Sequence, residues 1–558
     1  MSAAEQLLET RCISSLEKVF ADEELSAVPI QRAAALRNEV FSFQVAFRPK
    51  QTTGKMNVRV RIESEIAEVI SVRNVGLVPV ELPIYAGYEG KLLRSTPGLY
   101  PDPLMPIEEH RGLVAVPGQW RSAWFTVRLS EAVNPGQYPI TVVFEKEDGA
   151  ELARESLLLE VLSASLPEQK LIHTEWFHTD CLHTYYGVEV FSERYWEIVE
   201  EYVKTAVDHG INMLLTPLFT PPLDTKVGGE RPTVQLVDVW KEGDTYTFGF
   251  DRLKRWVDMC DRNGIRYFEL SHLFTQWGAK HAPKIIAVEN GETKRIFGWE
   301  TDATGEEYKS FLSQFLPALV RFIRENGLEQ RVYFHVSDEP HTEHIPWYES
   351  ASSLLKQHVG EFPTIDALSS YEFYERGLVP NPIPATNHIQ PFLENEVPNL
   401  WTYYCCSQFK KVSNRFMCYP SARNRVIGLQ LYKFRISGFL HWGYNFWYAQ
   451  YSLFPIDPYK VTDANYAFPS GDPFVVYPGK DGKPIESLRF EVFREALQDL
   501  RALELLESLI GRERTLALIE EGAGEPITFD TYPEDAEWLL ACRERINEAI
   551  RRHLPESV

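Results

Sequence analysis

The feature that most constrains the fold is a change in hydrophobic periodicity near the end of the first third of the chain. Before that point, apolar and polar residues alternate in short runs such as "FSFQVAF" (residues 41–47). A period of two is typical of half-buried strands, and turn signals such as "VNPGQYP" and "KEDGAE" separate the runs. We therefore predict that residues 1–166 form an N-terminal antiparallel β-sandwich domain.

After residue 167 helix and strand patterns alternate. "SERYWEIVEEYVKTAVDHG" begins with a serine cap, carries one apolar face and ends at a glycine, and the apolar segment "INMLLTPL" follows it. The unit repeats: "FDRLKRWVDMCDRNG" precedes "IRYFELSH", and "EEYKSFLSQFLPALVRFIRENG" precedes "RVYFHVSD". Helices alternating with nearly continuous apolar strands indicate parallel βα architecture.

Eight segments have this strand character: "LIHTEWFH", "INMLLTPL", "IRYFELSH", "RVYFHVSD", "FPTIDALS", "IPATNHI", "LWTYYCC" and "GFLHWGYNFW". Eight parallel strands close a TIM-type barrel. We therefore predict a multidomain α and β protein, in which residues 167–558 form a (β/α)8 barrel with C-terminal helices. A doubly wound open sheet is the alternative, although no glycine-rich phosphate loop follows the first strand.

Composition narrows the possible partners. The formal charge of −22 and the pI near 5.2 argue against nucleic acid or anionic lipid, which select basic surfaces. No apolar run approaches the ~20 residues of a membrane span. Seven cysteines without a CxxC pair indicate reduced thiols. The N-terminus lacks the pattern of a secretory signal, so we expect a cytoplasmic protein, and the sequence leaves the oligomeric state open.

The segment "HVSDEP" carries the most informative polar residues, Asp338 and Glu339. They stand where the fourth strand ends, so both side chains can enter one pocket. Two neighbouring carboxyl groups raise one another's pKa, which keeps one of them protonated as a general acid, and glycoside cleavage needs such an acid. The structural alternative is a loop or helix cap. The seventh strand segment, "LWTYYCCSQF", has no carboxylate to act as a nucleophile, which favours help from the substrate itself.

Four segments together resemble glycoside hydrolase family 123 and its related domain-of-unknown-function proteins: "LRNEVFSFQVAF", "HVSDEP", "GFLHWGYNFW" and "SGDPFVVYPGKDGKPIESLRFEVFREALQDL". The likeness extends from Asn38 to about residue 505. It implies a β-sandwich, a catalytic barrel and removal of terminal β-linked N-acetylgalactosamine through an oxazolinium intermediate with retention. It also implies that Glu339 protonates the leaving oxygen, while Asp338 orients the 2-acetamido group and stabilises its positive charge.

Further substrate contacts are expected near the ends of the strands. We predict that Tyr403 donates a hydrogen bond to the acetamido oxygen. The other candidates for sugar binding are Trp401, Trp442, Trp447, Asn445, Asp472, Glu269, His272 and His178. Each has a structural alternative, such as a buried ring, a backbone-capping amide or a turn-forming aspartate. Two long stretches after the second and third strands, residues 219–248 and 273–303, are expected to build the substrate cleft.

Other chemistries remain open. His335, His341 and His344 lie near the carboxylate pair, but the helical HExxH arrangement of a zinc site is missing, so we expect no metal and no other cofactor. The expected partner is an oligosaccharide or glycoconjugate substrate. One alternative function is a glycosidase that acts on a sugar without an acetamido group, with a carboxylate such as Glu269 as partner. The other is a catalytically silent carbohydrate-binding protein.

Overall fold

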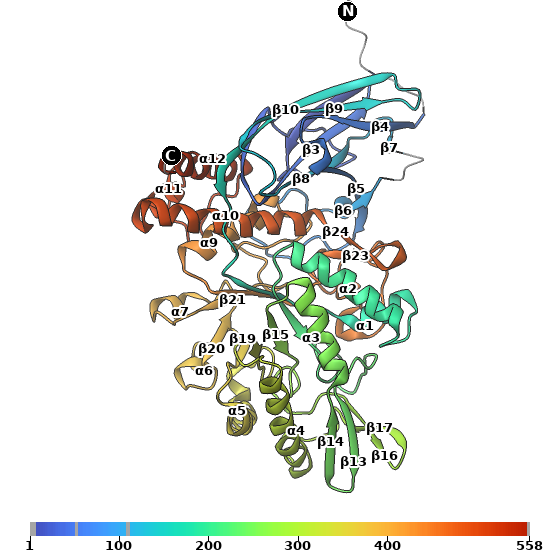
Figure 1. The fold of residues 1–558 in the computed structure, drawn as a ribbon, viewed down its shortest axis with the longest axis vertical. Coiled ribbons are helices and arrows are strands. Elements are labelled where there is room, and N and C mark those ends of the chain that lie inside the picture. The colour runs from blue at the N-terminus through green and yellow to red at the C-terminus, as the bar shows by residue number, and fades with distance from the viewer. Residues whose placement is uncertain (1–6, 51–53, 108–111, 555–558) are drawn as a thin grey trace, which may run out of the picture.

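The computed structural model describes residues 7–50, 54–107 and 112–554 (Figure 1). A β-rich N-terminal region lies at one end of the molecule, and a mixed region of strands and helices fills the rest. The predicted combination of a β-rich N-terminal part with α and β structure behind it is confirmed. Within the described residues, no helix is both long enough and apolar enough to cross a membrane. All seven cysteines are free thiols.

The N-terminal region contains two five-stranded sheets. The first has the order β1 (Leu8–Ser14), β3 (Glu39–Pro49), β8 (Arg121–Leu129), β5 (Ile70–Val80) and β6 (Gly98–Pro106). The second has the order β2 (Arg32–Arg37), β10 (Glu151–Ser165), β9 (Gly136–Glu145), β4 (Met56–Glu63) and β7 (Leu113–Ala115).

One strand pair departs from the predicted antiparallel arrangement, because β2 and β10 run parallel. The chain passes from β2 directly into β3 of the other sheet at Asn38, whose φ is 59°. No hairpin therefore joins β2 to β10, and nothing in the connection imposes antiparallel pairing. The period of two is borne out in the core that the two sheets share. Inward residues of that core include Phe43, Val45, Phe125, Val142 and Leu159.

Seven of the eight predicted strand segments contain a strand, and the sixth, residues 383–389, shares only Ile383 and Pro384 with its strand; the strands are two to four residues long. They are β11 (Ile172–Glu175), β12 (Met213–Thr216), β15 (Tyr267–Leu270), β18 (Val332–Tyr333), β19 (Ile365–Leu368), β20 (Asn381–Pro384), β21 (Trp401–Tyr403) and β22 (Gly438–His441). Six form a parallel sheet in the order β18-β15-β12-β11-β22-β21, and β19 pairs in parallel with β20. Single parallel bridges join Phe334 to Thr364 and Ala385 to Tyr403.

Helices follow most of these strands. Those before α8 are α1 (Thr179–Tyr186), α2 (Glu193–Asp208), α3 (Asp251–Asn263), α4 (Glu306–Glu325), α5 (Ile345–Val359), α6 (Glu372–Glu375) and α7 (Gln390–Glu394). The predicted caps are present: the Ser192 side chain accepts the Tyr195 N–H, and Gly264 ends α3 with a φ of 93°. The remaining helices are α8 (Ser421–Arg425), α9 (Ile427–Lys433), α10 (Leu488–Ile510), α11 (Arg512–Glu520) and α12 (Ala536–His553).

The two long stretches after β12 and β15 are not structureless. Together they supply a four-stranded sheet in the order β14 (Thr245–Gly249), β13 (Asp238–Glu242), β16 (Ile285–Glu289) and β17 (Glu292–Phe297). This sheet lies at the end of the molecule opposite the N-terminal sheets (Figure 1). Only the first part of each stretch therefore remains close to the strand ends.

Helix α10 connects the two regions of the molecule. It lies between the N-terminal sheets and the β/α part, and α12 lies beside it (Figure 1). Its buried Arg489 pairs with Asp102 of β6 at 2.8 Å, and its Glu491 pairs with Arg73 of β5 at 2.8 Å. Removing one partner of a buried ion pair costs roughly 3–5 kcal/mol. These contacts therefore fix the position of the N-terminal sheets relative to α10.

Candidate active site

Asp338 and Glu339 follow β18 at a sharp change of backbone direction. Glu339 adopts a φ of 43°, which is unfavourable for a residue with a Cβ. Two backbone hydrogen bonds hold this conformation: the Trp277 N–H donates to the Asp338 carbonyl at 3.0 Å, and the Glu339 N–H donates to the Ala367 carbonyl at 3.1 Å. As a result both carboxyl groups line one pocket.

The pocket has a volume of about 160 Å³. Its walls come from the carboxyl ends of the parallel strands, where the sequence placed the site. The lining residues are Trp176, Leu223, Asp224, Gln276, Trp277, Asp338, Glu339, Ala367, Tyr403, Cys405, Cys406, Leu440, Trp442, Gln450, Tyr451 and Phe468. Six of the sixteen lining residues are aromatic, and such rings suit the flat apolar faces of a sugar ring.

Burial and mutual repulsion perturb the acidic groups of the pocket. The pKa of Asp338 lies well above its usual value, first because the carboxyl is desolvated and second because Glu339 is adjacent. Burial raises the pKa of Asp224 to about 6. The direction of the shift in the pKa of Asp338 favours the protonated form of that carboxyl.

Tyr403 contacts the pair directly. Its hydroxyl donates a 2.7 Å hydrogen bond to Oε1 of Glu339. Burial and the neighbouring Glu339 hold the pKa of Tyr403 well above its ordinary value, so the phenol remains a donor. In the structure this donor serves Glu339, whereas we predicted that it serves an acetamido oxygen.

Comparison with known proteins identifies the family. The family model described as "Glycoside hydrolase 123, catalytic domain" matches residues 176–506. The chain belongs to glycoside hydrolase family 123. The predicted resemblance is thereby confirmed, and so is the assignment as a glycoside hydrolase that acts on a glycan. No curated protein matches the chain.

Solved structures agree with the family assignment. A family 123 glycoside hydrolase from Clostridium perfringens has a TM-score of 0.74 and 13% sequence identity, with 98% of each chain covered. At that identity the likeness establishes the fold. A β-glucuronidase from Parabacteroides merdae has a TM-score of 0.30 and 11% identity over 88% of this chain and 53% of its own, which carries no argument.

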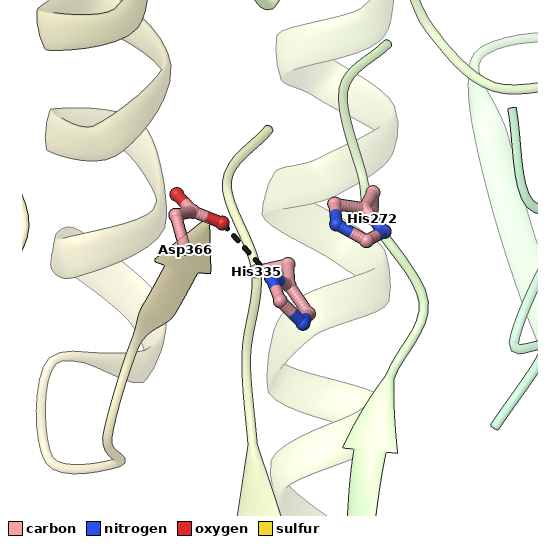
Figure 2. A group of neighbouring side chains, drawn as sticks. All are labelled: His272, His335 and Asp366. Carbon is pink, nitrogen blue, oxygen red and sulfur yellow. Dashed lines mark hydrogen bonds and ion pairs between the residues drawn. The ribbon is translucent and has the colours of Figure 1, made fainter. Parts of the chain in front are cut away.

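Beneath the carboxylate pair of this family 123 chain lies a buried network centred on His335. Its Nε2 is 2.5 Å from Oε1 of Glu269. Its Nδ1 is 2.9 Å from Oδ1 of Asp366 (Figure 2). Burial alone would lower the pKa of His335, but the two carboxylates raise it to about 10. His335 is therefore an imidazolium whose positive charge partly offsets the raised pKa of Asp338. Tyr348 also donates to Asp366 and fixes the far end of the network.

His272 is packed against this network rather than exposed in the pocket. Its ring stacks on His335 with centroids 4.0 Å apart, and neither ring nitrogen has a hydrogen-bond partner among the described residues. Burial and the adjacent His335 lower the pKa of His272 well below its usual value, so the ring is neutral. The face of the His272 ring thus packs against the imidazolium of His335.

Two groups of described side chains could hold a metal by distance alone: His272, His335 and Asp366, and His209, Glu486 and Glu491. In the first group His335 donates both ring N–H groups to carboxylates, so it has no lone pair for an ion. In the second group Glu491 already pairs with Arg73 and Arg494. His341 and His344 join neither group, and we assign no metal to the site.

Of the remaining predicted sugar contacts, only Trp442 lines the pocket. Its Nε1 donates to Oδ2 of Asp472 at 2.9 Å, so Asp472 orients the indole from behind. Glu269 does not reach the pocket, because its carboxylate accepts from Thr174, Trp176 and His335. The structure therefore makes Asp472 and Glu269 supports for other side chains.

The four further candidates contact other protein groups and do not line the pocket. The side chain of Asn445 binds the backbone of His178, because it accepts the His178 N–H at 2.9 Å and donates to the His178 carbonyl at 3.1 Å. The His178 ring contacts the Trp442 carbonyl and Arg231. Trp447 donates to the Val476 carbonyl at 3.2 Å, and Trp401 is buried against Tyr333 with ring centroids 5.7 Å apart. The sequence marked the right strand ends but not which side chain points into the pocket.

Sequence reasoning missed Asp224 and Tyr451, and it treated Trp277 only as part of a cleft-forming loop. All three line the pocket with backbone φ values of 39°, 60° and 57°. Such strained residues cluster at functional sites, but their φ values are set by tertiary contacts and leave no sequence signature. The one signal available was the position of Asp224 and Trp277 just after buried strands.

Proposed function

We propose that this family 123 enzyme removes terminal β-linked N-acetylgalactosamine by retaining, substrate-assisted cleavage. The observation that supports the proposal most strongly is the adjacent Asp338–Glu339 pair, which shares one pocket and in which burial favours a proton on Asp338. A second support is that both oxygens of Glu269 already accept hydrogen bonds, which leaves neither of them free to act as a nucleophile.

In the first step the acetamido carbonyl oxygen attacks the anomeric carbon. The bond to the leaving oxygen breaks, and Glu339 transfers its proton to that oxygen. The product is an oxazolinium ion, whose N–H is hydrogen-bonded to Asp338 as a carboxylate. In the second step Glu339 takes a proton from water, which attacks the same face that the leaving group left. Two inversions at the anomeric carbon give net retention.

The proton must therefore move between the two carboxyls when substrate binds. Burial favours a proton on Asp338, and the Tyr403 hydroxyl donates to Glu339. An acetamido N–H that donates to Asp338 favours its ionised form. Within one coupled pair this shifts the proton to Glu339, the general acid. Tyr403 is then free to donate to the acetamido oxygen.

The fold supports this site in a further way. We propose that the eight parallel strands form one (β/α)8 barrel, since the bridges Phe334–Thr364 and Ala385–Tyr403 connect β19 and β20 to the six-stranded sheet on both sides. We also propose that the N-terminal sheets form a β-sandwich domain over residues 1–166, with residues 167–558 as the catalytic domain. Residues 1–6 and 555–558 of these ranges lie outside the described residues.

One observation favours a second candidate, a glycosidase that acts on a sugar without an acetamido group. Asp224 places another carboxylate in the same pocket, where it could serve as a base for water. The two candidates differ in the first-formed product: substrate assistance retains the anomeric configuration, and a water attack on the glycoside inverts it. Proton NMR within the first minutes, on a β-N-acetylgalactosaminide and on the plain β-galactoside, shows which substrate is cleaved and which anomer forms first. The α-anomer appearing first would reject the proposed mechanism.

A further inference from the structure

The third carboxyl group in the pocket has no role in the mechanism above. Asp224 follows β12, whereas Asp338 and Glu339 follow β18, and β15 lies between these strands in the sheet. All three carboxyls line the same pocket, and Asp224 is one of the charges that raise the pKa of Asp338. Trp277, which follows β15, contacts both sides: its N–H donates to the Asp338 carbonyl, and its ring lies 5.9 Å from that of Tyr451.

The backbone around Asp224 is held rigidly. Its N–H donates to Oε1 of Gln276 at 2.6 Å, and its carbonyl accepts the Ser452 hydroxyl at 2.8 Å. One carboxylate oxygen, Oδ2, accepts the Tyr451 N–H at 2.9 Å. These contacts maintain the unfavourable φ of 39°, so the carboxyl group has a fixed direction before any ligand arrives.

The other oxygen, Oδ1, receives no hydrogen bond from a described side chain or backbone group. The nearest cationic influence is Arg231, but its guanidinium is committed to Asp180 at 2.7 and 2.8 Å. The Asp224 side chain is only partly buried, so Oδ1 is open to the pocket and can accept from a donor that enters there. Sugar hydroxyls are such donors, and the pocket lining also includes the polar residues Gln276 and Gln450.

We propose that Asp224 accepts a hydrogen bond from the C4 or C6 hydroxyl of the terminal sugar and thereby selects that sugar. The inference rests on the proposed function, which places the anomeric carbon beside Asp338 and Glu339. C4 is the ring position opposite C1, and C6 extends from the neighbouring carbon, so these hydroxyls face the wall that is remote from the pair. Asp224 is then a specificity-determining residue and not a base.

The test compares wild type with Asp224→Asn on three p-nitrophenyl β-N-acetylgalactosaminides: the parent, the 4-deoxy analogue and the 6-deoxy analogue. Asparagine retains an acceptor for the Tyr451 N–H and tolerates positive φ, so the fold is preserved. Asp457→Asn is the matched control, because Asp457 also accepts a backbone N–H, from Tyr459, but does not line the pocket.

We expect Asp224→Asn to lower kcat/KM for the parent by about 10- to 100-fold, mainly through KM, as for a lost hydrogen bond to a charged group. For the deoxy analogue that lacks the contacted hydroxyl, wild type and Asp224→Asn should agree within about threefold. Equal losses on all three substrates would overturn the assignment. A fall in kcat at unchanged KM would also overturn it, in favour of a base.

Calorimetric titration with free N-acetylgalactosamine separates this inference from the proposed function. If wild type does not hydrolyse the parent substrate, the proposed function fails, and sugar binding alone decides the role of Asp224. Binding at least tenfold weaker in Asp224→Asn than in wild type and Asp457→Asn supports the inference. Equal binding in all three proteins, or no binding to wild type, contradicts it.

Discussion

The hydroxyl of Tyr403 donates a 2.7 Å hydrogen bond to Oε1 of Glu339, across a pocket that also contains Asp338. In the proposed mechanism this hydroxyl donates to the acetamido oxygen when substrate binds, so it contacts the reacting group directly. Replacing Tyr403 by phenylalanine should lower kcat by roughly 10- to 100-fold, the cost of a lost hydrogen bond to a charged group. Steady-state kinetics on a β-N-acetylgalactosaminide measures this effect.

The neighbouring Tyr404 provides the control. It is buried on the opposite face, and its hydroxyl has no hydrogen-bond partner among the described residues. Tyr404→Phe should change kcat by less than about twofold. Comparable losses in the two variants would show that the effect comes from packing and not from the contact with Glu339.

The buried imidazolium of His335 makes a prediction about stability. Its pKa is raised to about 10, above the ordinary value near 6.5, so its contribution to folding is complete below pH 6.5 and is lost as the pH rises towards 10. His335→Gln should reduce the free energy of unfolding by roughly 3–5 kcal/mol at pH 6, because Glu269 and Asp366 lose their shared cation. The deficit should shrink at pH 10.

Urea unfolding at the two pH values, followed by tryptophan fluorescence, tests this prediction. The exposed His553 on α12 gives the matched variant His553→Gln, which should behave like wild type throughout. A deficit of His335→Gln that is the same at pH 6 and pH 10 would mean that the ring contributes by packing alone.

For Asp224 we predict the opposite effect on stability: its substitution should stabilise the protein. Burial raises its pKa to about 6 from an unfolded value near 3.9, so the free energy of unfolding falls as the pH rises through that window. At 1.36 kcal/mol per pH unit the penalty above pH 6 is at most ~3 kcal/mol, and contact with solvent in the pocket reduces it. Asp224→Asn should therefore melt at a higher temperature than wild type at pH 8 and at a similar one at pH 4. An identical difference at both pH values would contradict the assignment.

Much of the fold was predictable because local patterns and tertiary packing agree. The period of two in β3, β8 and β9 matches their shared core, and the caps at Ser192 and Gly264 bound α2 and α3 as expected. The small sheet of β13, β14, β16 and β17 was missed. Its strands carry many charged residues and pair across two separate insertions, so no single segment shows a clear period.

The site was predictable at the level of strand ends but not of side-chain directions. Asp338 and Glu339 stand together because one strained turn follows β18, and the sequence marks that turn with a conspicuous "SDEP". Trp401, Trp442 and Trp447 all lie in predicted strand segments, yet only Trp442 lines the pocket. Which ring points inward depends on distant partners such as Asp472, and no local pattern encodes that contact.

The most direct measurement of the central claim is the release of p-nitrophenol from the β-N-acetylgalactosaminide, the β-N-acetylglucosaminide and the plain β-galactoside. Wild type, Asp338→Asn and Glu339→Gln are compared side by side. The account predicts turnover of an acetamido sugar only, with losses of about 10²- to 10⁴-fold in both variants. Turnover of the plain galactoside by wild type, or full activity of Asp338→Asn, would contradict it.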